Sequence, residues 1–414
     1  PPLPGPDVLE FPTPLPSIDP NTYVDPLTWE DAMSRPTEAP FWVVGRNIEC
    51  RGMEGVLQPI PSLPHGHTHA AVPLKEVFKL KFKPDPDNPN NSIIDKFRVR
   101  IVGKGFKQQH GLHFDDTFAP TPHLTTVRIF YILLVQYNLK LKSCDAVQAF
   151  LNSPLDRDNI YVKLSGGMKE YFKTDYAVAL KGLYGLKQAA MLWNRLLFDF
   201  LRGIGLKQSI YDLCLWYIID PPRLTVFLLV QVDDILCATS SDKWFDEFYA
   251  KACAQWEFNR TKPDNFLQMT VSRTSEYLEL SVQRQVEKIA SQFGVTTGKA
   301  ITTPMDPQLK LETSESADPS VYPVYVSLIG SLWWWCRTGV RCDIEHHLRV
   351  LSKFSHCAQQ SHLDALLRVL RYVYHTRHYT LRIYKQTGDK PVLLAYTDAA
   401  FANCFTTLKS YSGY

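Results

Sequence analysis

The stretch VFLLVQVDDILCAT (226–239) places two adjacent aspartates, Asp233 and Asp234, between two apolar runs. Both runs are rich in residues that favour strands, so they predict a strand, a tight turn and a second strand. The turn would hold two carboxylates at the rim of a buried sheet, within reach of solvent and of a ligand. Because close carboxylates repel each other and a divalent cation removes that cost, the pattern predicts a Mg²⁺ site.

A second aspartate pair shows that the flanking residues carry this argument. Asp115 and Asp116 lie in GLHFDDTFAP (111–120), between Gly and Pro, where an exposed loop is expected. A third carboxylate strengthens the metal-site hypothesis, because LKLKSCDAVQAFL (139–151) alternates as a strand that ends near Asp145. One strand-end aspartate and a hairpin pair are typical of two-metal nucleotidyl transfer, in which the cations activate a 3′-hydroxyl and hold a triphosphate.

A basic hairpin is predicted earlier in the chain. VPLKEVFKLKFKP (72–84) and DKFRVRIVGKGF (95–106) each alternate apolar and charged residues, and PDPDNPNN (84–91) between them has the composition of a turn. Lys and Arg far outnumber Asp and Glu in this region, which suits the phosphates of a nucleic acid. A solvated charged face is the alternative interpretation.

The composition indicates the general class of protein to which these motifs belong. The chain has 414 residues, 45% of them apolar and 21% charged, and a net charge of +3, which indicates a globular protein of more than one structural unit. No apolar run approaches the roughly 20 residues that span a bilayer. The nine cysteines form no CxxC pair and are interpreted as reduced packing residues, and the HGHTH motif (65–69) as a surface loop rather than a zinc site.

Helical patterns occur at four places. They are TTVRIFYILLVQY (125–137), AAMLWNRLLFDFLRGIG (189–205), VSLIGSLWWWC (326–336) and SHLDALLRVLRYVYHT (361–376), for which Ser361 is the expected N-cap. The first 27 residues are rich in proline and predict a stiff, extended linker. With no initiating Met, the chain looks like a piece of something longer.

Taken together, these blocks resemble the reverse transcriptase of copia-type LTR retrotransposons, a segment of a Pol polyprotein, from about Trp29 to the last residue. The matching blocks occur in the family's order. They are FRVRIVGKGFKQQHGLHFDDTFAP, SCDAVQAFLNSPLDRDNIYVKL, LKGLYGLKQAAMLWN, VQVDDI, YPVYVSLIGSL, TGVRCDI, SHLDALLRVLRYVYHT and LLAYTDAAFA.

The resemblance implies an α+β right-hand polymerase with an antiparallel palm sheet, fingers and thumb. The expected parts are a Pro-rich linker (1–27), fingers and palm (28–270), a thumb-like region (271–325), connection helices (326–390) and a truncated RNase H-like start (391–414).

The resemblance also implies roles for individual residues. Metal ligands would be Asp145, Asp233 and Asp234, helped by the carbonyl of Ala146. Phe150 matches an aromatic gate that selects deoxynucleotides, and Gln188 a residue that contacts the nascent base pair. Arg98, Arg100 and Lys104 match positions that hold the triphosphate. The residues alone leave alternatives open. Phe150 could be a core phenylalanine, Gln188 a polar residue in a first helical turn, and the basic residues part of a solvated strand face.

Three departures from the family pattern stand out. Gln231 replaces the usual Tyr of the YVDD turn, and Gln268 replaces a Gly in the primer-grip turn, where it is expected to strain the backbone. Asp398 of the RNase H-like segment is retained, but Ala400 replaces a second Asp. A single carboxylate cannot assemble two metals, so no RNase H activity is expected.

The implied function is RNA-directed DNA synthesis with Mg²⁺ or Mn²⁺ in a cytoplasmic retrotransposon particle, with the product passing to the nucleus. The implied partners are an RNA template, a DNA or tRNA primer, dNTPs and other Pol and Gag products, with no membrane. Three alternatives stay open: a decayed, inactive remnant, a nucleic-acid-binding protein without catalysis, and another Mg²⁺ enzyme such as a cyclase. The three aspartates argue against the second, and Gln188 and Phe150 against the third.

Overall fold

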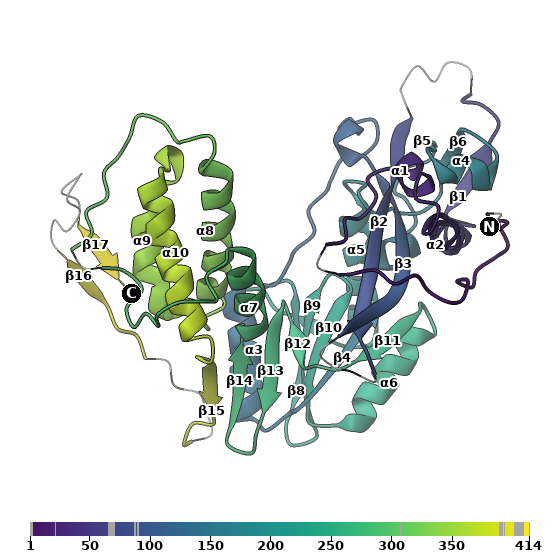
Figure 1. The fold of residues 1–414 in the computed structure, drawn as a ribbon. Coiled ribbons are helices and arrows are strands. Elements are labelled where there is room, and N and C mark those ends of the chain that lie inside the picture. Colours follow the sequence, from purple (N-terminus) through teal and green to yellow (C-terminus); the bar gives the residue numbers. More distant parts are fainter. Residues whose placement is uncertain are drawn as a thin grey trace.

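The structure is a computed structural model (Figure 1). It describes residues 3–20, 22–64, 71–86, 88, 91–306, 308–388, 392, 394–400 and 410–413, with the backbone alone at 398–400 and 411–413. Helices and largely antiparallel sheets follow one another irregularly along the chain, as the expected α+β class requires.

A six-stranded antiparallel sheet, here called the carboxylate sheet, occupies the middle of the molecule (Figure 1). Its strands run in the order β11-β4-β10-β9-β8-β7. Their bounds are β4 Lys140–Ala146, β7 Lys207–Gln208, β8 Leu215–Asp220, β9 Leu224–Gln231, β10 Asp234–Thr239 and β11 Phe258–Thr261.

Both faces of the carboxylate sheet are buried, which explains the apolar runs around the aspartate pair. Val226, Leu228 and Val230 share a core with helices α5 (Ala189–Gly203) and α6 (Asp242–Cys253). Phe227 and Leu229 point to the other face, against helix α3 (Leu124–Gln136). Successive side chains of β9 still project to opposite faces of the sheet, but each face is covered by a hydrophobic core, so the side chains on both faces are apolar.

The second sheet, here called the hairpin sheet, has the strand order β1-β6-β5-β2-β3. It consists of β1 Leu57–Ile60, β2 Val72–Pro84, β3 Ser92–Gly103, β5 Ile160–Lys163 and β6 Tyr176–Ala179. The basic hairpin is confirmed, since β2 pairs with β3 from Leu74 to Pro84. Phe78, Phe97 and Val99 are buried against Trp42 of helix α2 (Ala39–Gly52), while the Lys and Arg residues between them face outward. Strand β3 is the edge strand of this sheet. The short helices α1 (Trp29–Met33) and α4 (Gly167–Phe172) pack nearby.

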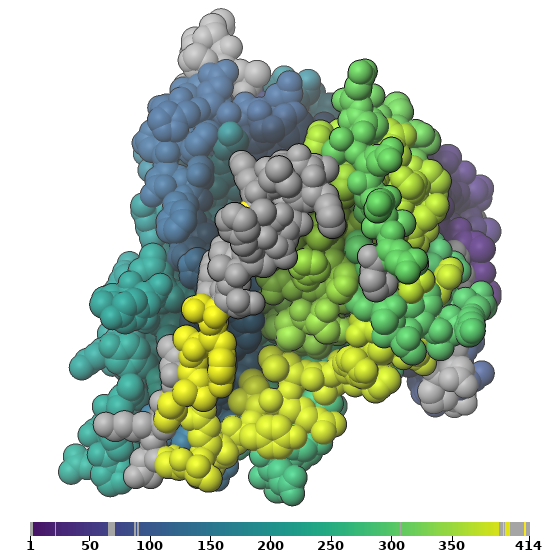
Figure 2. All heavy atoms as spheres, turned by 90° about the vertical axis from the view of Figure 1, so that its left-hand side faces the viewer, coloured from purple at the N-terminus to yellow at the C-terminus, as the bar shows by residue number. Residues whose placement is uncertain are grey.

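The C-terminal part combines a four-stranded sheet with helices (Figure 1). The sheet contains β12 Asn265–Phe266, β13 Met269–Arg273, β14 Tyr277–Ser281 and β15 Leu381–Tyr384, and the helices are α7 Gln283–Gln292, α8 Tyr322–Arg337, α9 Glu345–Ser352 and α10 Gln360–His375. Figure 2 shows the segment around β15, coloured yellow, at the surface beside the green helical region. Farther along, β16 Asp398–Ala400 pairs with β17 Tyr411–Gly413. Single turns of 3₁₀ helix occur at Gly105–Lys107, Ala149–Asn152, Cys342–Ile344 and Ser355–Cys357.

The expected cap of α10 was wrong. The N-cap is Gln359, which exchanges hydrogen bonds with His362 in a capping box, and Ser361 lies inside the first turn. The sequence signal was misleading because a serine followed by an acid is the common form of this box, and the Gln–His form is not.

Two expectations from composition have structural outcomes. The eight cysteines in the described ranges are free thiols, of which Cys253 and Cys342 are exposed. None of the helices in those ranges combines the length and apolar character needed to cross a bilayer.

Candidate active site

Three aspartates meet at one end of the carboxylate sheet. Asp145 near the end of β4 is paired directly with Asp234 at the start of β10. Residues opposite each other on neighbouring strands project to the same face, with their Cβ atoms about 4.5–5.5 Å apart. Asp233 lies in the turn before β10, and its carbonyl accepts a hydrogen bond of 3.0 Å from the backbone N–H of Ala146. The pairing of β4 with β10 thus joins carboxylates that are far apart in the sequence.

The turn that carries Asp233 is strained. Gln231 pairs with Asp234, so Val232 and Asp233 form a two-residue turn. Val232 has a φ of +60°, a conformation that Gly adopts freely and that a β-branched residue adopts at a cost of about 1–3 kcal/mol. Trp193 of α5, which is buried, donates its indole N–H to the Val232 carbonyl at 2.8 Å. This hydrogen bond is one of the contacts that keep the turn in place.

The carboxylates repel one another. Burial raises the pKa of Asp145, the charge of Asp233 raises it further, and Arg98 opposes the rise. Burial and then the charges of Asp233 and Asp145 raise the pKa of Asp234 to about 6. Since each negative charge destabilises the next, a cation placed among them would be favoured.

A cavity of about 500 Å³ opens between this turn and strand β3. Asp145, Ala146 and Asp233 line it on one side, and Arg98 and Arg100 on the other. The structure therefore brings together five of the residues expected to act on a nucleotide. Anionic and cationic groups face each other across a space large enough for a small phosphorylated ligand.

Sequence reasoning missed other residues of this cavity. Glu49 of α2 lines it, and accepts a hydrogen bond of 3.0 Å from the backbone N–H of Ile101. Burial raises the pKa of Glu49, while that hydrogen bond and the nearby Arg98 and Arg100 lower it. Tyr184 also lines the cavity, and the guanidinium of Arg100 lies 5.5 Å from the centre of its ring. Tyr184 stood in the quoted block LKGLYGLKQAAMLWN without a role, and nothing in the pattern around Glu49 distinguished it from other charged helix residues.

Three expected substrate-binding residues lie away from the cavity surface. Phe150 packs on Tyr184, with ring centres 5.3 Å apart, behind the residue that lines the cavity. Gln188 is fully buried at the start of α5, where it donates to the carbonyl of His113 at 2.8 Å and accepts from Gln108 at 3.0 Å. Lys104 follows the end of β3 and does not line the cavity. The interpretation of Gln188 as a polar residue of a first helical turn fits this placement.

The aspartates of this site could bind a divalent cation together with phosphate oxygens of a substrate. Within the described ranges, no three His, Cys, Asp or Glu side chains are arranged to hold a metal by themselves. Mg²⁺, however, is commonly held by one or two carboxylates, with phosphate oxygens and water completing its shell. Asp145 and Asp234, with raised pKa values and a shared register, supply such a partial set.

The remaining candidate residues have mixed outcomes. The pair Asp115 and Asp116 is exposed, as expected, and forms ion pairs with Arg157 and Arg195. Gln268 has a φ of +64° in the turn between β12 and β13, so the expected backbone strain is present there. The HGHTH motif and the side chains of Asp398 and Ala400 lie outside the described residues.

Comparison with known proteins decides the family. A family model described as "Reverse transcriptase (RNA-dependent DNA polymerase)" matches residues 60–307. This chain belongs to that reverse transcriptase family.

Individual relatives agree with the resemblance to copia-type Pol polyproteins. The Pol polyprotein from transposon RE1 of Arabidopsis thaliana is 30% identical over 347 residues, which cover 82% of this chain and 22% of the relative. That from transposon TNT 1-94 of Nicotiana tabacum is 28% identical over 379 residues, covering 87% and 28%. A putative transposon Ty5-1 protein of Saccharomyces cerevisiae is 32% identical over 275 residues, covering 65% and 87%. The reverse transcriptase chain thus spans about a quarter of the Pol polyproteins it matches.

Proposed function

We propose that this reverse transcriptase chain is an RNA-directed DNA polymerase that transfers nucleotides from dNTPs to a primer 3′-hydroxyl with Mg²⁺ or Mn²⁺. The observation that carries the proposal is the register that pairs Asp145 with Asp234 beside a cavity lined by Arg98 and Arg100. Acidic groups for cations and basic groups for a triphosphate meet there, and nucleotidyl transfer needs both.

Each side of the cavity has its own task. Arg98 and Arg100 neutralise the triphosphate and orient it toward the carboxylates. Asp145 and Asp233, which line the cavity, and Asp234 beside it would hold the divalent cations, with the Ala146 carbonyl as a further oxygen. When bound, those cations supply a more acidic 3′-hydroxyl and stabilise charge on the departing pyrophosphate.

Tyr184, which lines the cavity, and Phe150 behind it select the sugar. Phe150 supports Tyr184 from behind, and the two rings together narrow the space beside the sugar so that a 2′-hydroxyl is excluded. Gln188 acts indirectly, because its hydrogen bonds hold the segment from Gln108 to His113 against the start of α5. Lys104 meets phosphates of the template or primer rather than those of the nucleotide.

The wider assignment follows the family. The hairpin sheet with α2 forms the fingers, the carboxylate sheet the palm, α7 with its neighbouring strands the thumb, and α8–α10 the connection. Segment 391–414 belongs to an RNase H-like unit. An RNA template, a DNA or tRNA primer and other Pol and Gag products are the partners, in a cytoplasmic particle that delivers DNA to the nucleus.

A primer-extension assay on poly(rA)/oligo(dT) tests the proposal. The chain should incorporate dTTP only with Mg²⁺ or Mn²⁺, and Asp145→Asn or Asp234→Asn should lower the rate by at least about 100-fold. Asp115→Asn is the matched control, because that aspartate belongs to an exposed pair and should leave the rate unchanged. A folded protein that binds the hybrid without incorporation would instead indicate a decayed element.

A further inference from the structure

The Pro-rich N-terminal segment is fastened to the hairpin sheet at both ends. Near its start, the buried Asn47 of α2 donates its side-chain N–H groups to the carbonyls of Gly5 and Val8, at 2.7 and 3.0 Å. Near its end, Asp25 accepts from the Lys79 ammonium at 2.6 Å and from a backbone N–H of β2 at 2.7 Å. Residues 3–20 and 22–27, here called the strap, are therefore docked on the fold rather than left as a linker.

Apolar contacts hold the middle of the strap. The ring centre of Phe11 lies 6.2 Å from that of Phe97 in β3, and Phe97 also packs on Trp42 at 4.8 Å. Ile18 and Tyr23 pack against the same core. Proline suits this arrangement, because it lacks an N–H group and prefers an extended backbone that needs no strand partner.

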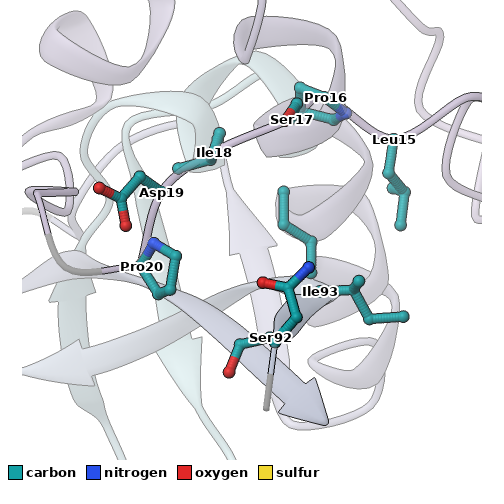
Figure 3. A pocket seen from close by; sticks show the side chains of 10 residues that line it. Leu15, Pro16, Ser17, Ile18, Asp19, Pro20, Ser92 and Ile93 are labelled. Carbon is teal, nitrogen blue, oxygen red and sulfur yellow. The ribbon is translucent and has the colours of Figure 1, made fainter. Parts of the chain in front are cut away.

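The strap also crosses the start of β3. A cavity of about 610 Å³ separates residues 15–20 of the strap from residues 91–94 (Figure 3). In this view Leu15, Ile18 and Asp19 lie on one side of the space, and Ser92 and Ile93 on the other. The strap therefore bridges the hairpin tip loosely and is anchored on either side of it.

One strap residue reaches the candidate active site. Phe11 lines the same cavity as Arg98, Arg100 and Asp145. Strand β3 is an edge strand whose strand partner is β2, and Phe97 on its buried face is covered by Trp42 of α2 and by Phe11 of the strap. Phe97 and Arg98 are adjacent in β3 and project to opposite faces, so a movement of the β3 backbone at Phe97 also moves Arg98.

We propose that the strap contributes Phe11 to the nucleotide site, as a positioning residue that acts on Arg98 and Arg100 through its contact with Phe97. This inference rests on the proposed function of the cavity. It assigns the strap a role in binding the incoming nucleotide and none in binding the template–primer hybrid.

Point variants in the full chain test the role of the strap. Phe11→Ala should raise the KM for dTTP by about 10-fold, with a smaller change in kcat, and leave the affinity for a fluorescent poly(rA)/oligo(dT) hybrid unchanged. Asn47→Ala should act in the same direction, and Phe11→Leu should restore most of the loss. Leu9→Ala is the control, because Leu9 is exposed in the same segment.

Two results would overturn the inference. One is a KM for dTTP that is unchanged in Phe11→Ala. The other is a KM that falls, which would make the strap an inhibitor of nucleotide entry.

A chain that folds but incorporates no dTTP refutes the proposed function and leaves the strap to be judged by hydrogen exchange. In that case β3 amides should lose protection in Phe11→Ala but not in Leu9→Ala. Equal protection in the two variants would refute the docking role itself.

Discussion

The hydrogen bond from Trp193 to Val232 offers a direct test of how the aspartate turn is held. Trp193→Phe removes the indole N–H but keeps an aromatic ring in the core. The loss of a buried hydrogen bond costs about 1 kcal/mol, and the carbonyl left without a partner adds about 1–2 kcal/mol. The smaller ring also leaves a void, which costs free energy by itself.

Trp216 is a matched control for that void. Both indoles are buried in the same core, with exposed fractions of 1% and 0%. Within the described ranges, the indole N–H of Trp216 has no hydrogen-bond partner. Trp216→Phe therefore shares the loss of ring volume but breaks no hydrogen bond, and it is the reference against which the loss in Trp193→Phe is measured.

Denaturant unfolding and steady-state incorporation of dTTP are the measurements. Trp193→Phe should lose about 2 kcal/mol more unfolding free energy than Trp216→Phe. Because the turn at Val232 is strained, its release should also move Asp233 and lower kcat by about 10- to 100-fold, with little change in KM. Equal losses in stability and in kcat for the two variants would refute the view that this bond holds the turn.

Three further changes follow from the same structure. Gln268→Gly should raise the unfolding free energy by about 1 kcal/mol, because Gly adopts the positive φ at that position without strain. Gln109→Gly, at an exposed position with no positive φ, should lower the unfolding free energy. A lower unfolding free energy in both variants would contradict the assignment of strain to Gln268. The folded protein binds the proton of Asp234 more tightly than the unfolded chain does, so the stability of the metal-free protein should fall as the pH rises from 3.8 to about 6. Mg²⁺ should raise the Tm at pH 7 but hardly at pH 5. An equal shift in Tm at both pH values would exclude Asp234 as a ligand. Gln188→Ala should lower the unfolding free energy by about 1–3 kcal/mol, because Gln108 loses its buried hydrogen-bond partner. If Gln188 served only to contact the base pair, the substitution would change the KM for dTTP with no loss of stability.

Local patterns predicted the elements that carry the site. Strict alternation located the β2–β3 hairpin, because one face of each strand is buried and the other is wet. The apolar flanks of Asp233 and Asp234 located β9 and β10, since a strand covered on both faces has few polar positions. Flanking residues also distinguished Asp233 and Asp234 from the second pair, Asp115 and Asp116, which the structure places in an exposed loop.

Other features depend on contacts between distant segments, which local patterns do not contain. The docking of the strap rests on a few side chains such as Phe11, whose partner Phe97 is far along the chain. The burial of Gln188 depends on a loop that closes over the start of α5. Glu49 reaches the cavity because α2 packs along the edge of β3, and one helix sequence does not reveal its neighbour.

The position of β4 also governs when the site can exist during synthesis of the protein. This strand lies between β10 and β11, both of which leave the ribosome long after it. Until they appear, a strand that carries a key acid has two unpaired edges, and such a strand is prone to associate with other chains. Premature termination between residue 146, where β4 ends, and residue 234, where β10 begins, would therefore yield an aggregation-prone product rather than a smaller working enzyme.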